Sequence, residues 1–111
     1  MGRKSIFDMP VAEVYPLLLA KAERKGRTKA ELDAVIFWLT GYEMDTADQS
    51  VPYGAFFENA PAMNPRAALI TGKVCGVDVA AIEDPLMRRI RQLDKLVDEL
   101  AKGRPMEKIL R

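Results

Sequence analysis

Apolar residues recur at helical spacing near the start of the chain, between residues 11 and 22. Steps of three and four residues place them on one face of a helix. Asp8 is positioned to cap this helix, and Pro10 is tolerated in its first turn. Pro16 lies well inside it and lacks a backbone donor, which predicts a kink or a restart near Tyr15. Gly26 ends the helix, because glycine adopts the left-handed closing conformation without a Cβ penalty. The apolar face comprises Val11, Val14, Tyr15, Leu18 and Ala22.

A second helix is predicted over residues 29–40, and Gly41 ends it. Its start is a capping box, in which the side chains of Thr28 and Glu31 each accept from the other's backbone N–H. A helix that is apolar on nearly all sides is typical of a buried helix, so we expect a later helix to cover Phe37 and Trp38 to join the core. If Phe37 stays uncovered, it forms an exposed patch that contacts a partner. One side carries Leu32, Val35, Ile36 and Leu39, and the opposite side Ala30, Ala34 and Phe37.

The middle of the chain predicts shorter elements. Residues 43–50 are polar and acidic and predict a loop. Ser50 is placed to cap a short helix that Pro61 closes. Asn64 and Pro65 together signal the start of a fourth helix, running to Gly76. As the alternative, residues 69–79 form a short β pair. The short helix carries Tyr53, Phe56 and Phe57, and the fourth helix Leu69, Ile70 and Val74.

The longest helix is predicted between Asp84-Pro85 and Gly103. Lys95 with Glu99, and Asp98 with Lys102, are opposite charges four residues apart, predicted on its solvent side. After it, residues 106–110 add a short turn that packs Ile109 and Leu110 against the core. The apolar seam of the helix consists of Leu86, Ile90, Leu93, Val97 and Leu100. We therefore predict an all-α fold, a compact bundle of about five helices with orthogonal or irregular packing, in one domain spanning residues 1–111.

The amino-acid composition limits the kinds of catalytic, metal-binding and membrane function that the chain can have. The 111 residues are 49% hydrophobic, enough for one core, and the net charge of +1 gives no global attraction to nucleic acid or acidic membranes. The absence of histidine removes Ser-His-Asp and Cys-His nucleophiles and most zinc sites. Cys75 is the single cysteine, and it is expected to be a buried structural residue in a reducing cytoplasm. No segment approaches the roughly 20 apolar residues that span a bilayer, so we predict no membrane association. We also predict no catalytic residue, cofactor or metal site.

A run of cations forms a basic corner between the first two helices, with a local net charge of +4 because Glu23 is its single acid. A solvated helix end is the favoured interpretation, since cations late in a helix complement its dipole. The alternative is contact with phosphates of a nucleic acid. A DNA-reading helix-turn-helix is disfavoured, because the second helix has few polar side chains for base edges. The cations of this basic corner are Lys21, Arg24, Lys25, Arg27 and Lys29.

Three arginines, Arg88, Arg89 and Arg91, lie early in the longest helix, where cations oppose the helix dipole. Pairing with Glu83, Asp84 or acids elsewhere is the favoured explanation, and an anion-binding surface is the alternative.

Three blocks of the sequence resemble a known family: VYPLLLAKAERKGRTKAELDAVIFWLTGY, LITGKVCGVDVAAIEDPLM and LDKLVDELAKGRPMEKILR. They are similar, in order and spacing, to the bacterial domain of unknown function 2200. The resemblance covers nearly the whole chain and is weakest over residues 43–63. It implies a compact helical fold and no particular activity.

The leading hypothesis is a small cytoplasmic protein that acts without catalysis by binding a protein partner or a second copy of itself, with Phe37 as a contact. The alternative is nucleic-acid binding through the basic corner. A third is an enzyme that uses carboxylates, Tyr42 or Arg88.

Overall fold

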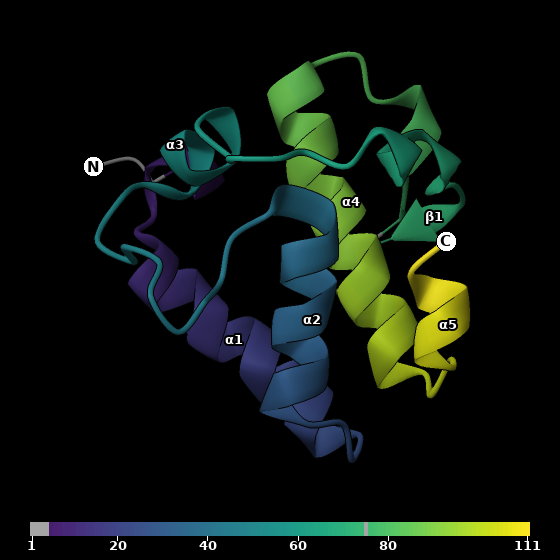
Figure 1. Cartoon of the computed structure of the whole chain (residues 1–111). Helices are drawn as coiled ribbons and strands as arrows, with labels where there is room; N and C mark the ends of the chain where they lie inside the picture. Colours follow the sequence, from purple (N-terminus) through teal and green to yellow (C-terminus); the bar gives the residue numbers. More distant parts are fainter. Residues whose placement is uncertain (1–4, 75) are drawn as a thin grey trace.

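Three helices carry most of the structure, a computed structural model that describes residues 5–74 and 76–111 (Figure 1). They are α1 (Val11–Arg24), α2 (Lys29–Thr40) and α4 (Pro85–Ala101). Helix α4 packs against α1, α2, the short α3 (Tyr53–Glu58) and the C-terminal α5 (Met106–Ile109). The predicted bundle of about five helices is confirmed. The longest helix therefore organises the core, and the others are arranged around it.

The turn between α1 and α2 follows its local sequence. Gly26 has φ 80°, and the N–H groups of Gly26 and Arg27 donate to the carbonyls of Glu23 and Ala22, both at 3.0 Å. This pattern is a Schellman motif, which satisfies the last carbonyls of a helix. The capping box of Thr28 and Glu31 is also present. Both predicted helix boundaries are confirmed, because they depend on neighbouring residues alone.

The start of α1 depends on distant residues instead. Asp8 lies in a short 3₁₀ turn, η1 (Ile6–Asp8), and α1 begins after Pro10 without a side-chain cap. The N–H groups of Val11 and Ala12 donate to the carbonyls of Val51 (3.0 Å) and Gln49 (2.8 Å). The predicted Asp8 cap is wrong, because backbone carbonyls of residues 49–51 accept hydrogen bonds from the first N–H groups of α1.

Helix α1 continues through Pro16 without a break, so the predicted restart near Tyr15 is wrong. Both Pro16 and Ala12, whose carbonyl Pro16 leaves without a donor, lie on the exposed side of the helix. Water can satisfy that carbonyl there, which makes the proline tolerable.

Residues 53–82 differ most from expectation. Helix α3 carries Tyr53, Phe56 and Phe57 as predicted, but it begins after Pro52, and Ser50 does not cap it. The Ser50 hydroxyl instead donates to Asp48 at 2.6 Å, and the N–H of Tyr53 donates to the carbonyl of Met9 at 2.7 Å.

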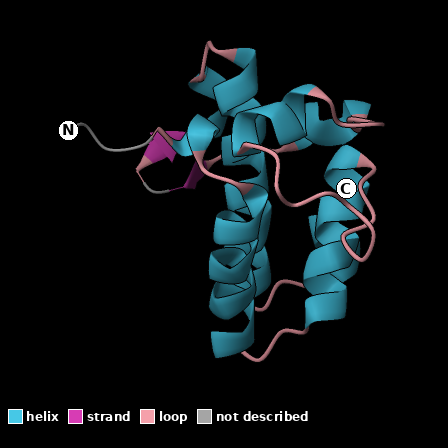
Figure 2. Cartoon of the chain, turned by 90° about the vertical axis from the view of Figure 1, so that its left-hand side faces the viewer, coloured by secondary structure: helices cyan, strands magenta, loops and turns pink. Residues whose placement is uncertain are grey.

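The predicted fourth helix is wrong, and the alternative β pair is confirmed. The chain forms two 3₁₀ turns, η2 (Pro65–Leu69) and η3 (Val79–Ala81), around the antiparallel strands β1 (Lys73–Val74) and β2 (Val77–Asp78). Asn64 does cap η2, with its side chain accepting from Arg66. Gly72 and Gly76 adopt positive φ, which a continuing helix excludes. Figure 2 shows the strand pair at one edge of the helices.

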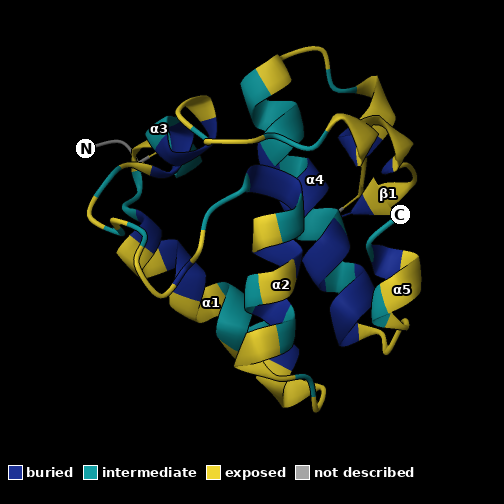
Figure 3. Ribbon diagram, in the orientation of Figure 1, coloured by how far each residue is buried: buried dark blue, intermediate teal, exposed yellow. Residues whose placement is uncertain are grey.

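The core is apolar and lies between α4 and the faces of the other helices (Figure 3). Ile109 of α5 is fully buried, and Leu110 packs partly against the core, as predicted. The predicted pair of Asp98 and Lys102 is confirmed at 3.0 Å. The pair of Lys95 and Glu99 is wrong, since Glu99 is buried and binds other cations. The core includes Val14, Ala22, Leu32, Val35, Ile36, Leu39, Phe56, Phe57, Ile70, Ile90, Leu93, Leu96, Val97 and Leu100.

Two arginines near the C-terminus bind the buried carboxylate of Glu99. Arg111 binds Glu99 at 2.7 Å and Arg104 binds it at 3.4 Å. The Lys95 ammonium instead donates to the carbonyl of Lys73 at 3.3 Å. Burying a carboxylate is costly unless it is paired, so the arginines fix the C-terminal segment on α4.

Candidate functional site

Phe37 is exposed on the outer side of α2, with 53% of its surface open to solvent. The prediction that a later helix covers it is wrong. Ile36, the residue before it, faces the core and is 1% exposed. Ala30 and Ala34 are also exposed, so Ala30, Ala34 and Phe37 form one apolar stripe along the helix. An exposed apolar stripe of this kind is a candidate contact surface.

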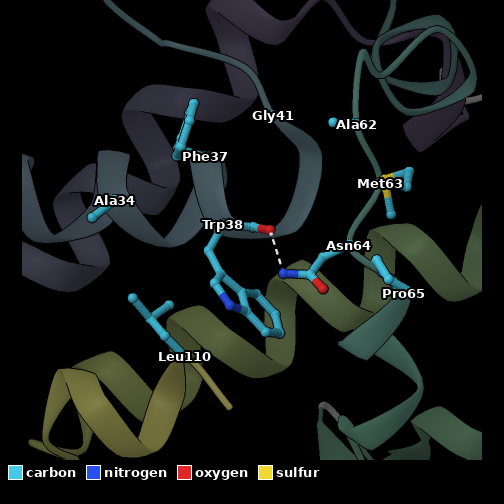
Figure 4. A pocket seen from close by; sticks show the side chains of 9 residues that line it. All are labelled: Ala34, Phe37, Trp38, Gly41, Ala62, Met63, Asn64, Pro65 and Leu110. Carbon is cyan, nitrogen blue, oxygen red and sulfur yellow. Dashed lines mark hydrogen bonds between the residues drawn. The ribbon is translucent and has the colours of Figure 1, made fainter.

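A surface hollow of about 570 Å³ lies on one side of Phe37 (Figure 4). None of the residues that line it is charged. Trp38 is half-buried rather than fully in the core, and its indole lies between Leu110 and the segment 62–65. We call this hollow the Phe37 groove. Its lining consists of Ala34, Phe37, Trp38, Gly41, Ala62, Met63, Asn64, Pro65 and Leu110.

Hydrogen bonds fix the two walls of the Phe37 groove to each other. The N–H groups of Ala62 and Asn64 donate to the carbonyls of Thr40 (3.0 Å) and Leu39 (2.9 Å). The Asn64 side-chain amide donates to the carbonyl of Trp38 at 3.0 Å (Figure 4). These three carbonyls end α2 and have no partner within the helix. The segment 62–64 thus caps α2 from outside and gives the groove a fixed shape.

Gly41 permits this close approach. Its φ is 83°, and a Cβ added there would lie 2.9 Å from the Cβ of Ala62 and 3.0 Å from its backbone N. Any other residue would combine a strained backbone with a steric clash.

A second hollow, of about 450 Å³, lies on the other side of Phe37. We call it the acidic hollow, because its lining holds three carboxylates and no cation. Ala34 and Phe37 line both hollows, so Phe37 forms a ridge between an apolar and an acidic surface. The lining residues are Ala30, Asp33, Ala34, Phe37, Glu43, Met44 and Asp45.

One cation approaches the acidic hollow from its rim. The Lys29 ammonium binds Asp33 at 2.7 Å and Asp45 at 3.3 Å, and hydrogen bonding to these carboxylates raises the pKa of Lys29. The Tyr15 hydroxyl donates to Asp33. Burial, followed by that hydrogen bond, raises the pKa of Tyr15 to about 12. One lysine against three carboxylates leaves the acidic hollow net negative.

The structure separates the five cations of the basic corner. Lys29 binds the acids just described, and Arg27 binds Glu31 at 2.9 Å and donates to the carbonyl of Arg104 at 3.0 Å. The other three line one hollow of about 590 Å³ between α1 and α4, which we call the basic hollow. It is lined by Leu17, Lys21, Arg24, Lys25, Asp98, Ala101 and Lys102.

The charges of the basic hollow are partly balanced from within. Asp98 binds Lys21 at 3.5 Å and Lys102 at 3.0 Å. Burial acts to raise the pKa of Asp98, but the hydrogen bonds and charges of these two lysines outweigh it and lower the pKa. The carbonyl ends of α1 and α4 also lie here, and their partial negative charge offsets part of the positive charge of these cations.

The three arginines of α4 bind mostly backbone. Arg88 donates to the carbonyl of Ile82, Arg89 donates to that of Phe57 at 2.8 Å, and Arg91 pairs with Asp94 at 3.0 Å. The favoured prediction of acid pairing is confirmed for Arg91 and wrong for the other two, which bind carbonyls at the ends of η3 and α3.

Residues considered for catalysis have structural partners. The Tyr42 hydroxyl donates to the carbonyl of Phe56 at 2.8 Å, and the two rings stack with centroids 4.0 Å apart. Cys75 lies outside the described residues. Within the described ranges, no three acidic or cysteine side chains gather as metal ligands. No helix there is long and apolar enough to cross a bilayer.

Sequence reasoning identified Phe37 as a possible contact, assigned Trp38 to the core, and missed the opposite wall of the groove. Residues 62–65 and Leu110 meet α2 only through tertiary packing, so no local pattern marks them. The acidic run at 43–50 was visible as a loop. Its position beside Phe37 was not, because that position depends on the turn after Gly41.

Comparisons with known proteins agree on the fold and name no activity. A bacterial family described as "Uncharacterized protein conserved in bacteria (DUF2200)" matches residues 5–111. The crystal structure of the uncharacterized protein SP1917 has 46% sequence identity and a TM-score of 0.88. The match covers 98% of this chain and 94% of that one. A comparison with curated proteins gives no match.

Proposed function

Because the chain belongs to this family of uncharacterized bacterial proteins, DUF2200, we propose a function from its surface: it acts without catalysis, in the cytoplasm, by binding a protein through the Phe37 groove and the stripe beside it. The single observation that carries the proposal is the exposure of Phe37, at 53%, on a helix whose other large apolar side chains are buried or half-buried. In this proposal the chain acts as one domain, and the groove recognises its partner by shape and apolar contact.

Physical reasons support this surface as the contact. An aromatic side chain beside a preformed hollow is a common anchor of protein interfaces. Covering the exposed half of Phe37 would contribute roughly 1 kcal/mol from apolar burial alone. The hydrogen bonds from residues 62–64 to the end of α2 shape the groove in advance, which lowers the entropy lost on binding.

Affinity purification from cells that express the protein natively tests the proposal. The tagged chain replaces the native copy in these cells, and wild type is compared with Phe37→Ser and with Glu58→Lys plus Glu83→Lys, which changes charge at exposed sites away from the groove. We expect at least one protein to be recovered with wild type, retained by the double variant and reduced at least tenfold by Phe37→Ser. Equal recovery with all three baits would contradict the proposal.

Nucleic-acid binding is retained as the second candidate, because Lys21, Arg24 and Lys25 do line one hollow with Lys102. It predicts affinity for short RNA or DNA duplexes that falls steeply with salt and is lost in Arg24→Ala plus Lys25→Ala. Affinity that is indifferent to salt would exclude this candidate. The carboxylate in the hollow and the helix ends beside it make it the weaker one.

A further inference from the structure

The basic hollow and the surface around the apolar stripe of α2 carry opposite charges, and each has an exposed apolar side chain, although both belong to one chain. On α1, Leu17, Lys21 and Arg24 follow steps of four and three residues, so they lie on one face of the helix. Leu17 is 63% exposed, the largest exposed fraction among the large apolar side chains of the described residues. This face presents an apolar anchor followed by cations.

The surface around Phe37 presents the matching features. The groove offers an uncharged hollow, and the exposed Ala30 and Ala34 leave room for a helix to approach α2 closely. The acidic hollow beside it supplies Asp33, Glu43 and Asp45 against the single cation Lys29. An apolar contact is therefore flanked by carboxylates on one side.

We propose that this surface binds a second copy of the chain. Leu17 of one copy contacts the apolar stripe of Ala30, Ala34 and Phe37 on the next copy. Arg24 and Lys25 of the first copy then face Glu43 and Asp45 of the second. This inference rests on the proposed function and specifies its partner. Among the ion pairs of the described residues, Arg24, Lys25 and Glu43 take no part, and Asp45 is held only by exposed Lys29. Their charges are thus available to another molecule.

The two surfaces belong to different places on the molecule. The basic hollow shares no lining residue with either hollow beside Phe37. One copy can therefore offer both surfaces at once, and the contact is head to tail rather than a two-fold one. A head-to-tail contact continues into a ring or a chain of copies instead of stopping at a dimer.

Sedimentation of the purified full chain, from micromolar to millimolar concentration and at low and high salt, tests this contact. We expect the average mass of wild type to rise with concentration beyond that of a dimer. High salt weakens the assembly, because exposed charge pairs are screened. Phe37→Ser and Leu17→Ser should each lower the association constant at least tenfold.

Two charge-reversed variants make the test specific. Glu43→Lys plus Asp45→Lys turns the acidic surface basic, and Arg24→Glu plus Lys25→Glu turns the basic surface acidic. Each variant alone should remain monomeric, because its two surfaces then repel. An equimolar mixture of the two should assemble again, since every contact between unlike copies joins opposite charges. Glu58→Lys plus Glu83→Lys, which changes the same charge at exposed sites elsewhere, should assemble like wild type.

Three results would overturn the inference: wild type that is monomeric throughout, assembly that survives both reversals, or a mixture that stays monomeric. A monomeric wild type that still captures a different protein through Phe37 would overturn the second copy as partner and leave the proposed function intact. If no capture depends on Phe37, the proposed function fails as well. Circular dichroism of each variant confirms that it is folded.

Discussion

The Phe37 groove and the basic hollow differ in what holds them together. Backbone carbonyls at the end of α2, the closely packed Gly41 and a half-buried amide contact of Asn64 shape the groove, and its lining is uncharged. The basic hollow is formed by long, flexible side chains around Asp98. The Phe37 groove is a fixed surface that can recognise the shape of a partner. The basic hollow instead offers long cationic side chains that favour a negatively charged partner. In the proposed assembly the two roles are complementary.

The difference also teaches where a binding surface is visible in a sequence. Five cations within nine residues attract attention immediately, yet the structure pairs three of them with acids of the same chain. A single exposed phenylalanine attracts little attention, and it becomes the centre of a surface only when distant segments assemble around it. A run of charge is often a solvated face, and its significance depends on which acids fold beside it.

The contrast between core and surface on α2 predicts the largest effect. Ile36→Ala removes a buried side chain and should lower the free energy of unfolding by about 2–5 kcal/mol. Phe37→Ser, at the adjacent residue, should change it by less than about 0.5 kcal/mol, because half of that ring is already in water. Urea denaturation of both variants measures the difference. A comparable loss for Phe37→Ser would mean that the ring is part of the core and not a contact surface.

The tight approach in the groove predicts the next effect. Gly41→Ala should lower the free energy of unfolding by about 2–4 kcal/mol, because it adds the clash with Ala62 to the strain of a positive φ. Gly26→Ala is the matched control: its φ is also positive, at 80°, but nothing lies within 4 Å of the added Cβ. It should cost about 1 kcal/mol from backbone strain alone. Equal losses in thermal or urea unfolding would show that the wall of the groove yields easily.

A smaller effect concerns the acidic hollow, where the neutral Tyr15 hydroxyl donates to Asp33. The folded-state pKa of Tyr15 lies above that of a free tyrosine, at about 12. Its contribution is therefore fully present below the ordinary tyrosine pKa and is lost as the pH rises through the folded value. Tyr15→Phe should cost about 1 kcal/mol at neutral pH, and less than that in strongly alkaline solution. A difference between the two proteins that does not change with pH would contradict this account of the bond.

The smallest effect is expected in the basic hollow, for Asp98→Asn. Its pKa is lowered in the folded protein, so its stabilising contribution is present above the unfolded pKa and is lost as the pH falls through the folded one. Because both lysines that pair with Asp98 are substantially open to solvent, we expect a loss of about 0.5 kcal/mol near neutral pH and none in strong acid. The variant also removes the only carboxylate among the described residues that line the hollow. Tight, salt-dependent nucleic-acid binding by Asp98→Asn would favour the second candidate function.

Local signals predicted the helices well. The capping box at Thr28 and the Asp84-Pro85 start involve residues a few positions apart, so neighbours alone decide them. The predictions failed where distant backbone intervened. Asp8 is not the cap of α1 because residues 49–51 supply the acceptors, and Ser50 is not the cap of α3 because Met9 does. Residue propensities alone did not decide between a helix and a strand pair for residues 65–79. In the structure, glycines with positive φ stop a helix there and permit the strand pair.

The candidate site could be predicted only in part, for the same reason. The helical wheel placed Phe37 opposite the core, but whether anything covers that side depends on where later segments pass. Glu99 gives the converse case. Its spacing to Lys95 indicates a surface pair, and Arg104 and Arg111 instead bind it in a buried position after the chain turns at Gly103.

The most direct measurement of the central claim is photo-crosslinking in cells that express the protein natively. A photoreactive phenylalanine analogue is placed at position 37 in one variant and at position 69 in another. Leu69 is a matched control, since it is 57% exposed against 53% for Phe37 but lines none of the three hollows described above. We predict discrete protein adducts, including adducts with a second copy, from position 37 and none from position 69. Equal adducts from both positions, or none from position 37, would contradict the assignment of this groove as the binding surface.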